Sequence, residues 1–235
     1  MINLSEEQPL YRYFAQPKVN SYLSSIIGYE LLLKVYTPHG WRIPDNFNLI
    51  PSRIIAQRLV EATEKLASKI GSVSVNLSSI QLINPLIREA LLQAQANLRP
   101  VRLVIEMIEE KNGVSIHDHR VLAAVKDFTD QGMSFSIDDV DTGQNTWDNI
   151  QPLIPYATEI KYALQNRHEH LDDPVVRERL MLWAQRCKQL NIHLIVEGIE
   201  DPADVEWADT LKLDLRQGYH YGKPHLVRLK DSDPD

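Results

Sequence analysis

Carboxylate, amide and lysine side chains recur at or near the ends of short β-branched runs in this 235-residue chain. The densest case is FSIDDVDTG, where an apolar run ends on Asp138 and Asp139, and Asp141 follows two residues later. A single polar residue at a strand end is usually a solvated loop residue. Five further runs share this feature and carry Asn76, Glu106, Lys161, Glu197 and Gln217. Together the six runs predict one common site.

The chemistry of such a site follows from its ligand types. Carboxylates that gather in one place need cations, because like charges raise one another's pKa. Asp, Glu and one Asn form an all-oxygen set, which selects Mg²⁺ or Mn²⁺ over Zn²⁺. Two ions about 4 Å apart suit hydrolysis of a phosphodiester, because they activate water and neutralise the developing charge. The alternative is a salt-bridge network without a metal, which is costly to bury.

Three residues of the set have more specific expected places. Asp138 and Asp139 are adjacent, so their side chains point in different directions and can serve two metals or bridge them. Lys161 would lie close to the nucleophilic water or hold a phosphate oxygen.

Strands alternate with helices along most of the chain. The predicted strands are Phe14–Val19, Tyr29–Val35, Ser72–Leu77, Arg102–Met107, Ser134–Asp138, Glu159–Tyr162, His193–Glu197 and Asp214–Tyr219. The predicted helices are Pro51–Lys69, Pro85–Ala96, His117–Gln131, Pro174–Asn191 and Pro202–Leu211. This alternation predicts an α/β fold, a closed (β/α)8 TIM-like barrel whose strand ends share one mouth.

One connection departs from that pattern. Between Val19 and Tyr29 there is no room for a crossover helix, so the first strand is expected to pair antiparallel with the second. The alternative fold is an open doubly wound sheet. It has little support, because no glycine-rich phosphate turn follows any strand.

Composition bounds the class of protein. The chain is 43% hydrophobic and 24% charged, as in ordinary soluble globular domains. No apolar run reaches the roughly 18 residues that a membrane span needs, so no membrane partner is expected. The net charge of −7 argues against binding to a nucleic acid polymer. The single cysteine, Cys187, excludes an internal disulfide and fits a cytoplasmic location.

The domain boundaries follow from the predicted elements. We expect one domain over residues 14–228, preceded by an N-terminal extension at 1–13 and followed by a frayed C-terminal tail at 229–235. No linker or repeat divides the chain, so the protein is expected to act without a fused sensor.

Eight motifs resemble, in order, those of the EAL domain family of bacterial cyclic di-GMP phosphodiesterases. They are QPKV, GYELLLKV, VNLS, IEMIE, IDDVDTG, IK, VEGIE and QGYHYGKP. They run from Gln16 to Pro224, and the family's Glu-Ala-Leu is present as Glu30-Leu31-Leu32. The resemblance implies a barrel with the first strand reversed, and hydrolysis of cyclic di-GMP to the linear dinucleotide pGpG.

The resemblance also assigns roles by position. It implies Mg²⁺ or Mn²⁺, two ions, with Glu30, Asn76, Glu106 and Asp138 on one ion, Asp139 on the second, and Glu197 in the same cluster. It implies a catalytic set of Lys161, which lies next to the attacking water, Glu30 and Glu197. It implies substrate contacts from Gln16, Lys34 and Gln217, and a tether for the loop after the Asp pair from Glu109. Glu30 and Lys34 share one face of an extended strand, so they can grip metal and phosphate respectively.

Several positions depart from the family pattern. Lys34 replaces an arginine, and its point charge lacks the bidentate fork that grips phosphate. Ala163 stands where the family has Asp, so a water or a neighbouring side chain must substitute. Val140 replaces Phe, and Asp141 replaces a glycine whose backbone freedom a side chain resists. We interpret Asp141 as a variation of the loop rather than a third ligand.

The resemblance favours an active phosphodiesterase that lowers cyclic di-GMP and so affects motility, fimbriae and biofilm, and it makes a homodimer plausible. The alternative is a catalytically weak or inactive receptor, or a protein-binding regulator, on the same barrel. A third possibility is a phosphodiesterase for another nucleotide.

Overall fold

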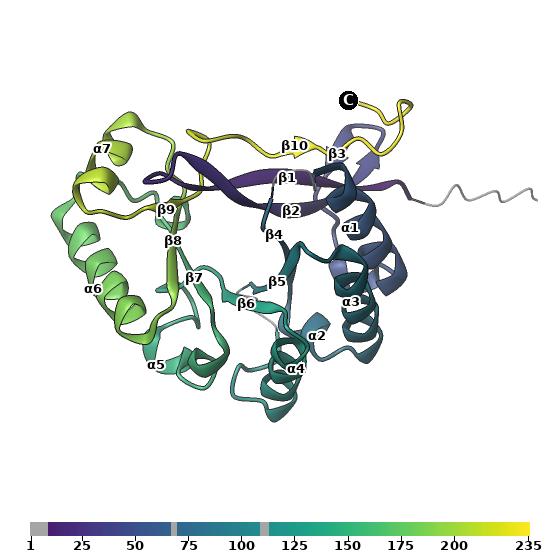
Figure 1. Cartoon of the computed structure of the whole chain (residues 1–235), viewed down its shortest axis with the longest axis horizontal. Coiled ribbons are helices and arrows are strands. Elements are labelled where there is room, and N and C mark those ends of the chain that lie inside the picture. Colours follow the sequence, from purple (N-terminus) through teal and green to yellow (C-terminus); the bar gives the residue numbers. More distant parts are fainter. Residues whose placement is uncertain (1–8, 67–69, 109–112) are drawn as a thin grey trace, which may run out of the picture.

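A closed eight-stranded barrel forms the centre of the molecule (Figure 1). The computed structural model describes residues 9–66, 70–108 and 113–235, and all structural statements refer to these. The barrel strands are β1 (Tyr11–Asn20), β2 (Ser25–Thr37), β4 (Ser72–Leu77), β5 (Arg102–Met107), β6 (Ser134–Ile137), β7 (Glu159–Ala163), β8 (His193–Glu197) and β9 (Leu215–Arg216). The prediction of a (β/α)8-like barrel is confirmed.

The first strand is reversed, as predicted. β1 pairs antiparallel with β2 from Tyr11 opposite Val35 to Asn20 opposite Ser25. It closes the barrel by pairing antiparallel with β9, where Val19 lies opposite Arg216. All other neighbours in the barrel are parallel. Two short strands extend the sheet beyond the barrel, β3 (Gly40–Arg42) beside β2 and β10 (His225–Leu226) beside β1.

Several strands differ from their predicted limits, and β1 and β2 are longer than predicted at both ends. The last barrel strand is shorter than expected, since β9 covers only two residues. Gln217 still adds a ladder bond, because its N–H donates to the carbonyl of Val196 at 2.9 Å. β6 ends at Ile137, and the N–H of Asp138 donates to the carbonyl of Met107 at 3.1 Å.

Helices lie around the parallel strands, while β10 and the C-terminal segment run along β1 (Figure 1). The helices are α1 (Ser52–Leu66), α2 (Ser79–Leu82), α3 (Pro85–Leu98), α4 (His119–Asp130), α5 (Trp147–Ile150), α6 (Pro174–Leu190) and α7 (Pro202–Thr210), with 3₁₀ turns η1 (Phe47–Leu49), η2 (Ile154–Tyr156) and η3 (Gln165–Arg167). α4 begins two residues later than predicted because Asp118 is its N-cap and accepts a bond from the Arg120 N–H. Such a cap is worth about 1 kcal/mol. The end of the first predicted helix, at 67–69, lies outside the described residues.

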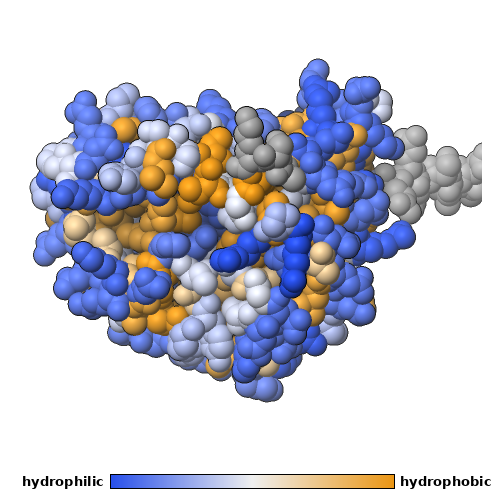
Figure 2. All heavy atoms as spheres, in the orientation of Figure 1, coloured by the Kyte–Doolittle hydropathy of each residue, from blue (hydrophilic) through white to orange (hydrophobic). Residues whose placement is uncertain are grey.

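The hydrophobic core lies between the strands and these helices. Leu59 of α1, Leu91 of α3 and Leu180 of α6 are fully buried in one cluster with outward-facing strand residues such as Leu103 and Ile160. Burying each leucine is worth about 1.5–3 kcal/mol. Figure 2 shows hydrophilic side chains over the outer helices and hydrophobic ones gathered nearer the centre of that face.

The interior of the barrel is polar. Alternate strand residues point away from the helices. Five of these residues are at most 1% exposed: Lys18, Ser74, Glu106, Ser136 and Lys161. Buried charges are tolerated only when they are paired, so this interior must carry its own ion pairs or hold cations.

The C-terminal tail is docked, and the expectation that it frays was wrong. Asp233 is 5% exposed and accepts bonds from Arg12 of β1, including one of 2.8 Å from the Arg12 Nε. The backbone N–H groups of Leu229 and Lys230 donate to the same carboxylate. An ion pair between residues far apart in sequence fixes this tail, and periodicity could not reveal it.

The described residues contain no helix long and apolar enough to span a membrane.

Candidate active site

Lys161 lies at the centre of an acidic cluster at the mouth of the barrel. Its ammonium contacts one carboxylate from each of four other strands or strand ends: Glu197 at 2.7 Å, Glu106 at 2.9 Å, Glu30 at 3.2 Å and Asp138 at 3.6 Å. Parallel strands bring these residues together because their carboxyl ends meet at one end of the barrel. The structure therefore assembles the residues that the sequence predicted.

Amide side chains complete the cluster. Asn76 donates to Glu30 Oε1 at 2.6 Å, and Gln217 donates to Glu30 Oε2 at 2.6 Å. Gln217 also donates to Gln16 Oε1 at 3.3 Å, and Gln16 donates to the Gly222 carbonyl at 3.3 Å. Glu30 is thus held by two amides and Lys161, with Gln16 one bond further out.

Burial and charge divide the carboxylates into two kinds. Burial alone would raise the pKa of Glu106, but Lys161 and Lys18 hold it at about 2. Burial raises the pKa of Glu197 to about 7, and Glu30 adds to this rise. Burial also raises the pKa of Asp138 well above its usual range, with Glu197 and Asp139 adding to it. The Lys161 ammonium alone does not keep the pKa values of Glu197 and Asp138 low, so further positive charge at the mouth would stabilise these carboxylates.

The cluster fits a divalent cation. Ligand oxygens of Asp138, Asp139 and Glu197 lie within 4.8 Å of one another. Within the described part of the chain, the buried amide oxygens Asn76 Oδ1 and Gln217 Oε1 have no hydrogen-bond partner. Buried acceptors normally find a partner, and a cation would supply one. Carboxylate and amide oxygens are the ligands that hard divalent metals prefer.

The loop after β6 places Asp139 and Asp141 in a strained backbone conformation. Asp139 has φ of 50° and Asp141 has φ of 66°, both in the left-handed region that favours glycine. The Asp139 N–H donates to Asp138 Oδ1 at 2.9 Å, and the Asn145 amide donates to the Asp138 carbonyl at 2.7 Å. Asp139 Oδ1 also accepts a bond of 2.5 Å from Asn166. Asp141 therefore adopts the left-handed backbone conformation that was expected at this position, where the family pattern has a glycine.

Lys18 lies deeper in the barrel, and sequence reasoning missed it. Its ammonium contacts Glu106 Oε1 at 3.2 Å, Glu159 at 3.4 Å and the Ser74 hydroxyl at 3.2 Å. Glu106 is consequently held between two lysines, Lys18 below and Lys161 above. The available signal was strand alternation, which places Lys18 on the same face as Gln16.

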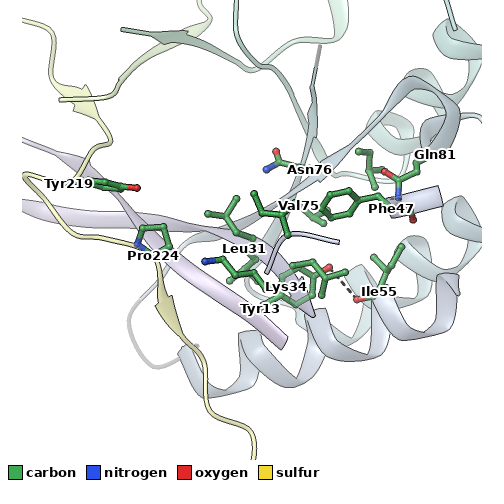
Figure 3. A pocket seen from close by; sticks show the side chains of 14 residues that line it. Tyr13, Leu31, Lys34, Phe47, Ile55, Val75, Asn76, Gln81, Tyr219 and Pro224 are labelled. Carbon is green, nitrogen blue, oxygen red and sulfur yellow. Dashed lines mark hydrogen bonds between the residues drawn. The ribbon is translucent and has the colours of Figure 1, made fainter. Parts of the chain in front are cut away.

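Two cavities adjoin at the mouth. One has a volume of about 300 Å³ and is lined by polar residues, among them Glu30, Asp139, Glu197 and Asn166. The other has a volume of about 270 Å³ and is lined mainly by apolar side chains of β2, β4 and α1, with the Tyr13 hydroxyl donating a hydrogen bond to the Ile55 carbonyl at its far end (Figure 3). Three residues line both cavities: Leu32, Tyr219 and Pro224.

Two predicted residues lie apart from the carboxylates. Lys34 lines the apolar cavity (Figure 3). Its ammonium lies 4.2 Å from the centre of the Phe14 ring. Partial burial and the neighbouring Arg42 lower the pKa of Lys34. Its assignment as a phosphate ligand remains a prediction. Glu109, the predicted loop tether, lies outside the described residues.

Comparison with known proteins gives consistent matches. A protein-family model described as EAL domain matches residues 4–224. The probable cyclic di-GMP phosphodiesterase PdeD of Escherichia coli K12 is 23% identical over 97% of this chain and 44% of its own length. The chain spans less than half the length of this relative and of PdeG from the same organism.

Solved structures agree in fold. The PaMucR phosphodiesterase in complex with c-di-GMP superposes with a TM-score of 0.75 at 25% identity, over 92% of this chain and 97% of that one. Klebsiella pneumoniae BlrP1, in a manganese and cy-diGMP complex, superposes with a TM-score of 0.76 at 19% identity, over 94% and 57%.

Proposed function

Because the chain belongs to the EAL domain family, we propose that it hydrolyses cyclic di-GMP to linear pGpG with the help of divalent metal ions. The observation that carries this proposal is the acidic mouth around Lys161, which combines oxygen ligands, a fixed ammonium and unpartnered amide oxygens. The relatives and solved structures whose names refer to cyclic di-GMP support the choice of substrate.

The number of carboxylates at the mouth supports two ions. Glu30, Glu106, Asp138, Asp139 and Glu197 bring five carboxylates to it, and ligand oxygens of Asp138, Asp139 and Glu197 lie within 4.8 Å of one another. Divalent cations would stabilise so many carboxylates in one place. We propose Mg²⁺ or Mn²⁺, since every ligand is a hard oxygen, and the manganese complex of BlrP1 supports Mn²⁺.

The family resemblance supports the proposed ligand sets. Glu30, Asn76, Glu106 and Asp138 would hold one ion and Asp139 the second, with Glu197 in the same cluster. Bound cations would neutralise the phosphate and make water a better nucleophile.

The protein's own groups orient the reaction. The Lys161 ammonium stays charged, because burial would lower its pKa but Asp138, Glu106, Glu197 and Glu30 together raise it well above its usual value. Lys161 can therefore orient the attacking water and stabilise charge on the phosphoryl oxygens. The water oxygen adds to phosphorus and gives up one proton, the bond from phosphorus to the 3′ oxygen breaks, and the 3′ oxygen takes up one proton, so that one water is consumed for each bond cleaved.

The substrate would lie across both cavities. Gln16 and Gln217 line or border the polar cavity, where the phosphate would bind. The adjoining apolar cavity would take a flat base, with Tyr219 and Pro224 at the boundary between the two. Lys34 would act from its rim rather than from the carboxylate cluster.

A second function has one observation in its favour. Ala163 is buried next to Glu197 in the β7–β8 register, so β7 offers only Lys161 as a polar group toward the mouth. A poorly completed metal site would suit a receptor of cyclic di-GMP or a protein-binding regulator. The homodimer, the cytoplasmic location and the effects on motility, fimbriae and biofilm stay predictions.

The test is turnover of the purified protein. Incubation with cyclic di-GMP and Mg²⁺ or Mn²⁺ should yield pGpG, measured by chromatography, and a chelator should abolish it. Glu30→Gln, which removes one charge at constant size, should lose at least about a hundredfold in rate. Glu64→Gln makes the same change on the exposed face of α1 and should keep the wild-type rate.

Absence of product with folded wild-type protein would refute the enzyme. Calorimetric binding of cyclic di-GMP in that case would support the receptor instead.

A further inference from the structure

We propose that Asn166 and Arg179 are positioning residues, which hold the carboxylate of Asp139 from the segment that follows β7. The inference rests on the proposed function, because it gives these side chains a purpose in a metal site. Asn166 acts directly on Asp139, and Arg179 acts through Asp141.

The loop after β6 needs support from outside. Asp139 and Asp141 both lie in the left-handed region, where a side chain crowds the backbone carbonyl. Such conformations persist only when surrounding contacts fix them. Backbone bonds supply part of this support: the N–H of Val140 donates to the Lys161 carbonyl at 3.1 Å, and that of Asp141 donates to the Asn145 carbonyl at 2.9 Å. These bonds fix the path of the chain but do not orient the Asp139 side chain.

Asn166 orients that side chain. It lies in η3, five residues after Lys161, and its amide donates to Asp139 Oδ1 at 2.5 Å. A hydrogen bond to one carboxylate oxygen fixes the rotamer and directs the other oxygen. Both residues line the polar cavity, together with Glu197. Ala163 brings no polar group to this side of the mouth, so the hydrogen bond to Asp139 comes from η3, the turn that follows β7.

Arg179 links the same loop to α6. Its guanidinium lies 2.5 Å from Glu169 and 3.7 Å from Asp141. The Tyr162 hydroxyl donates to the other oxygen of Glu169 at 3.1 Å. The cluster thus joins β7, α6 and the loop after β6. It explains why the chain carries Asp at position 141: the carboxylate gives Arg179 a partner on the loop, which glycine could not.

Binding of Mn²⁺ to the metal-free protein tests the proposal without reference to turnover. Asn166→Ala should weaken one class of Mn²⁺ site by roughly tenfold or more in calorimetry, as loss of an outer partner of a metal ligand does. Arg179→Met and Asp141→Asn should weaken the same class by at least threefold. Arg179→Lys keeps the charge and should restore at least half of the loss in binding free energy.

Matched controls separate positioning from general damage. Asn97→Ala lies on the exposed face of α3, and Arg88→Met removes an exposed ion pair with Asp127. Both should leave Mn²⁺ affinity within twofold of wild type. In hydrogen exchange of the metal-free protein, the Asn166 and Arg179 variants should lose protection at the amides of Val140 and Asp141, and the controls should not.

The two proposals fail in different ways. Wild type that binds Mn²⁺ but does not hydrolyse cyclic di-GMP would refute the proposed function. The Mn²⁺ affinities of the variants relative to wild type would still test the positioning role. Variants that all bind Mn²⁺ within twofold of wild type would overturn the positioning role even if the enzyme is active. If wild type binds no Mn²⁺, unchanged exchange protection of the loop in the variants would overturn it.

Discussion

Replacing Lys18 with methionine should destabilise the metal-free protein strongly. Lys18 is 1% exposed and contacts Glu106 at 3.2 Å and Glu159 at 3.4 Å. Each pair of unit charges at that distance attracts by about 5 kcal/mol at an effective dielectric constant of about 20. Part of this attraction offsets the cost of burying the ammonium, so the net effect is smaller than the sum.

The expected loss is about 3–5 kcal/mol of unfolding free energy, as for other buried pairs that lose one partner. Glu106 dominates this loss because it is fully buried, whereas the Glu159 side chain is 16% exposed and can turn toward water. Folded domains hold only about 5–15 kcal/mol in total, so the change will be large in urea unfolding at constant temperature. Lys188→Met, at an exposed position of α6, should change the same quantity by less than about 0.5 kcal/mol.

The pH dependence of this stability loss tests whether the Lys18 ammonium is its source. Burial would lower the pKa of Lys18, but Glu159 and Glu106 raise it above the ordinary value of 10.5. The contribution of Lys18 to stability is therefore complete below pH 10.5 and is lost only as the pH rises further. The difference between wild type and Lys18→Met should stay constant from pH 6 to pH 9.

A second variant covers the case in which Lys18→Met does not fold. Lys18→Met combined with Glu106→Gln removes both charges and should recover more than half of the loss, because the carboxylate that still lacks Lys18, Glu159, is 16% exposed and can turn toward water. A loss below about 1 kcal/mol in the single variant, the size of a surface ion pair, would refute the claim that Lys18 holds Glu106.

Three further predictions concern the tail, a close approach and the metal. Arg12→Met should cost about 1.5–3 kcal/mol at pH 7. Burial would raise the pKa of Asp233, but Arg12 and backbone donors lower it to about 2, so this difference should shrink in unfolding titrations as the pH falls from about 4 toward 2. Gly218→Ala would place a Cβ 2.2 Å from the Ile199 carbonyl oxygen, at φ of 155°. We expect a loss of about 1–3 kcal/mol of unfolding free energy in urea and weaker calorimetric binding of cyclic di-GMP. Wild-type values for both quantities would contradict this. Mn²⁺ at a hundred times its dissociation constant should stabilise wild type by about 2.7 kcal/mol per site in thermal unfolding. Addition of a chelator should reverse this gain. An unchanged unfolding midpoint would mean that no ion binds the folded state.

The barrel and much of the site could be predicted from sequence because both depend on local patterns. Buried parallel strands appear as short β-branched runs, and the short connection before Tyr29 required an antiparallel first pair. Polar residues at strand ends, such as Glu106 and Glu197, stand out against apolar runs. Motifs around Glu30 and Asp138 then gave the family.

The contacts that complete the site were decided by tertiary structure. Lys18 and Glu159 are far apart in sequence, and only barrel closure sets their ammonium and carboxylate 3.4 Å apart. The same holds for Arg12 with Asp233 in the docked tail. Asn166 follows no motif, and its bond to Asp139 depends on how the turn after β7 packs against the loop after β6.

The sequence by itself determined which side chains reach the mouth of the barrel, because strand order and alternation fix their level and direction. The tertiary structure decided how each charge is balanced, because ion pairs depend on distances of a few ångströms between separate strands. Asp141 illustrates both: its place in IDDVDTG was visible in the sequence, but its position 3.7 Å from Arg179 was set by the packing of α6.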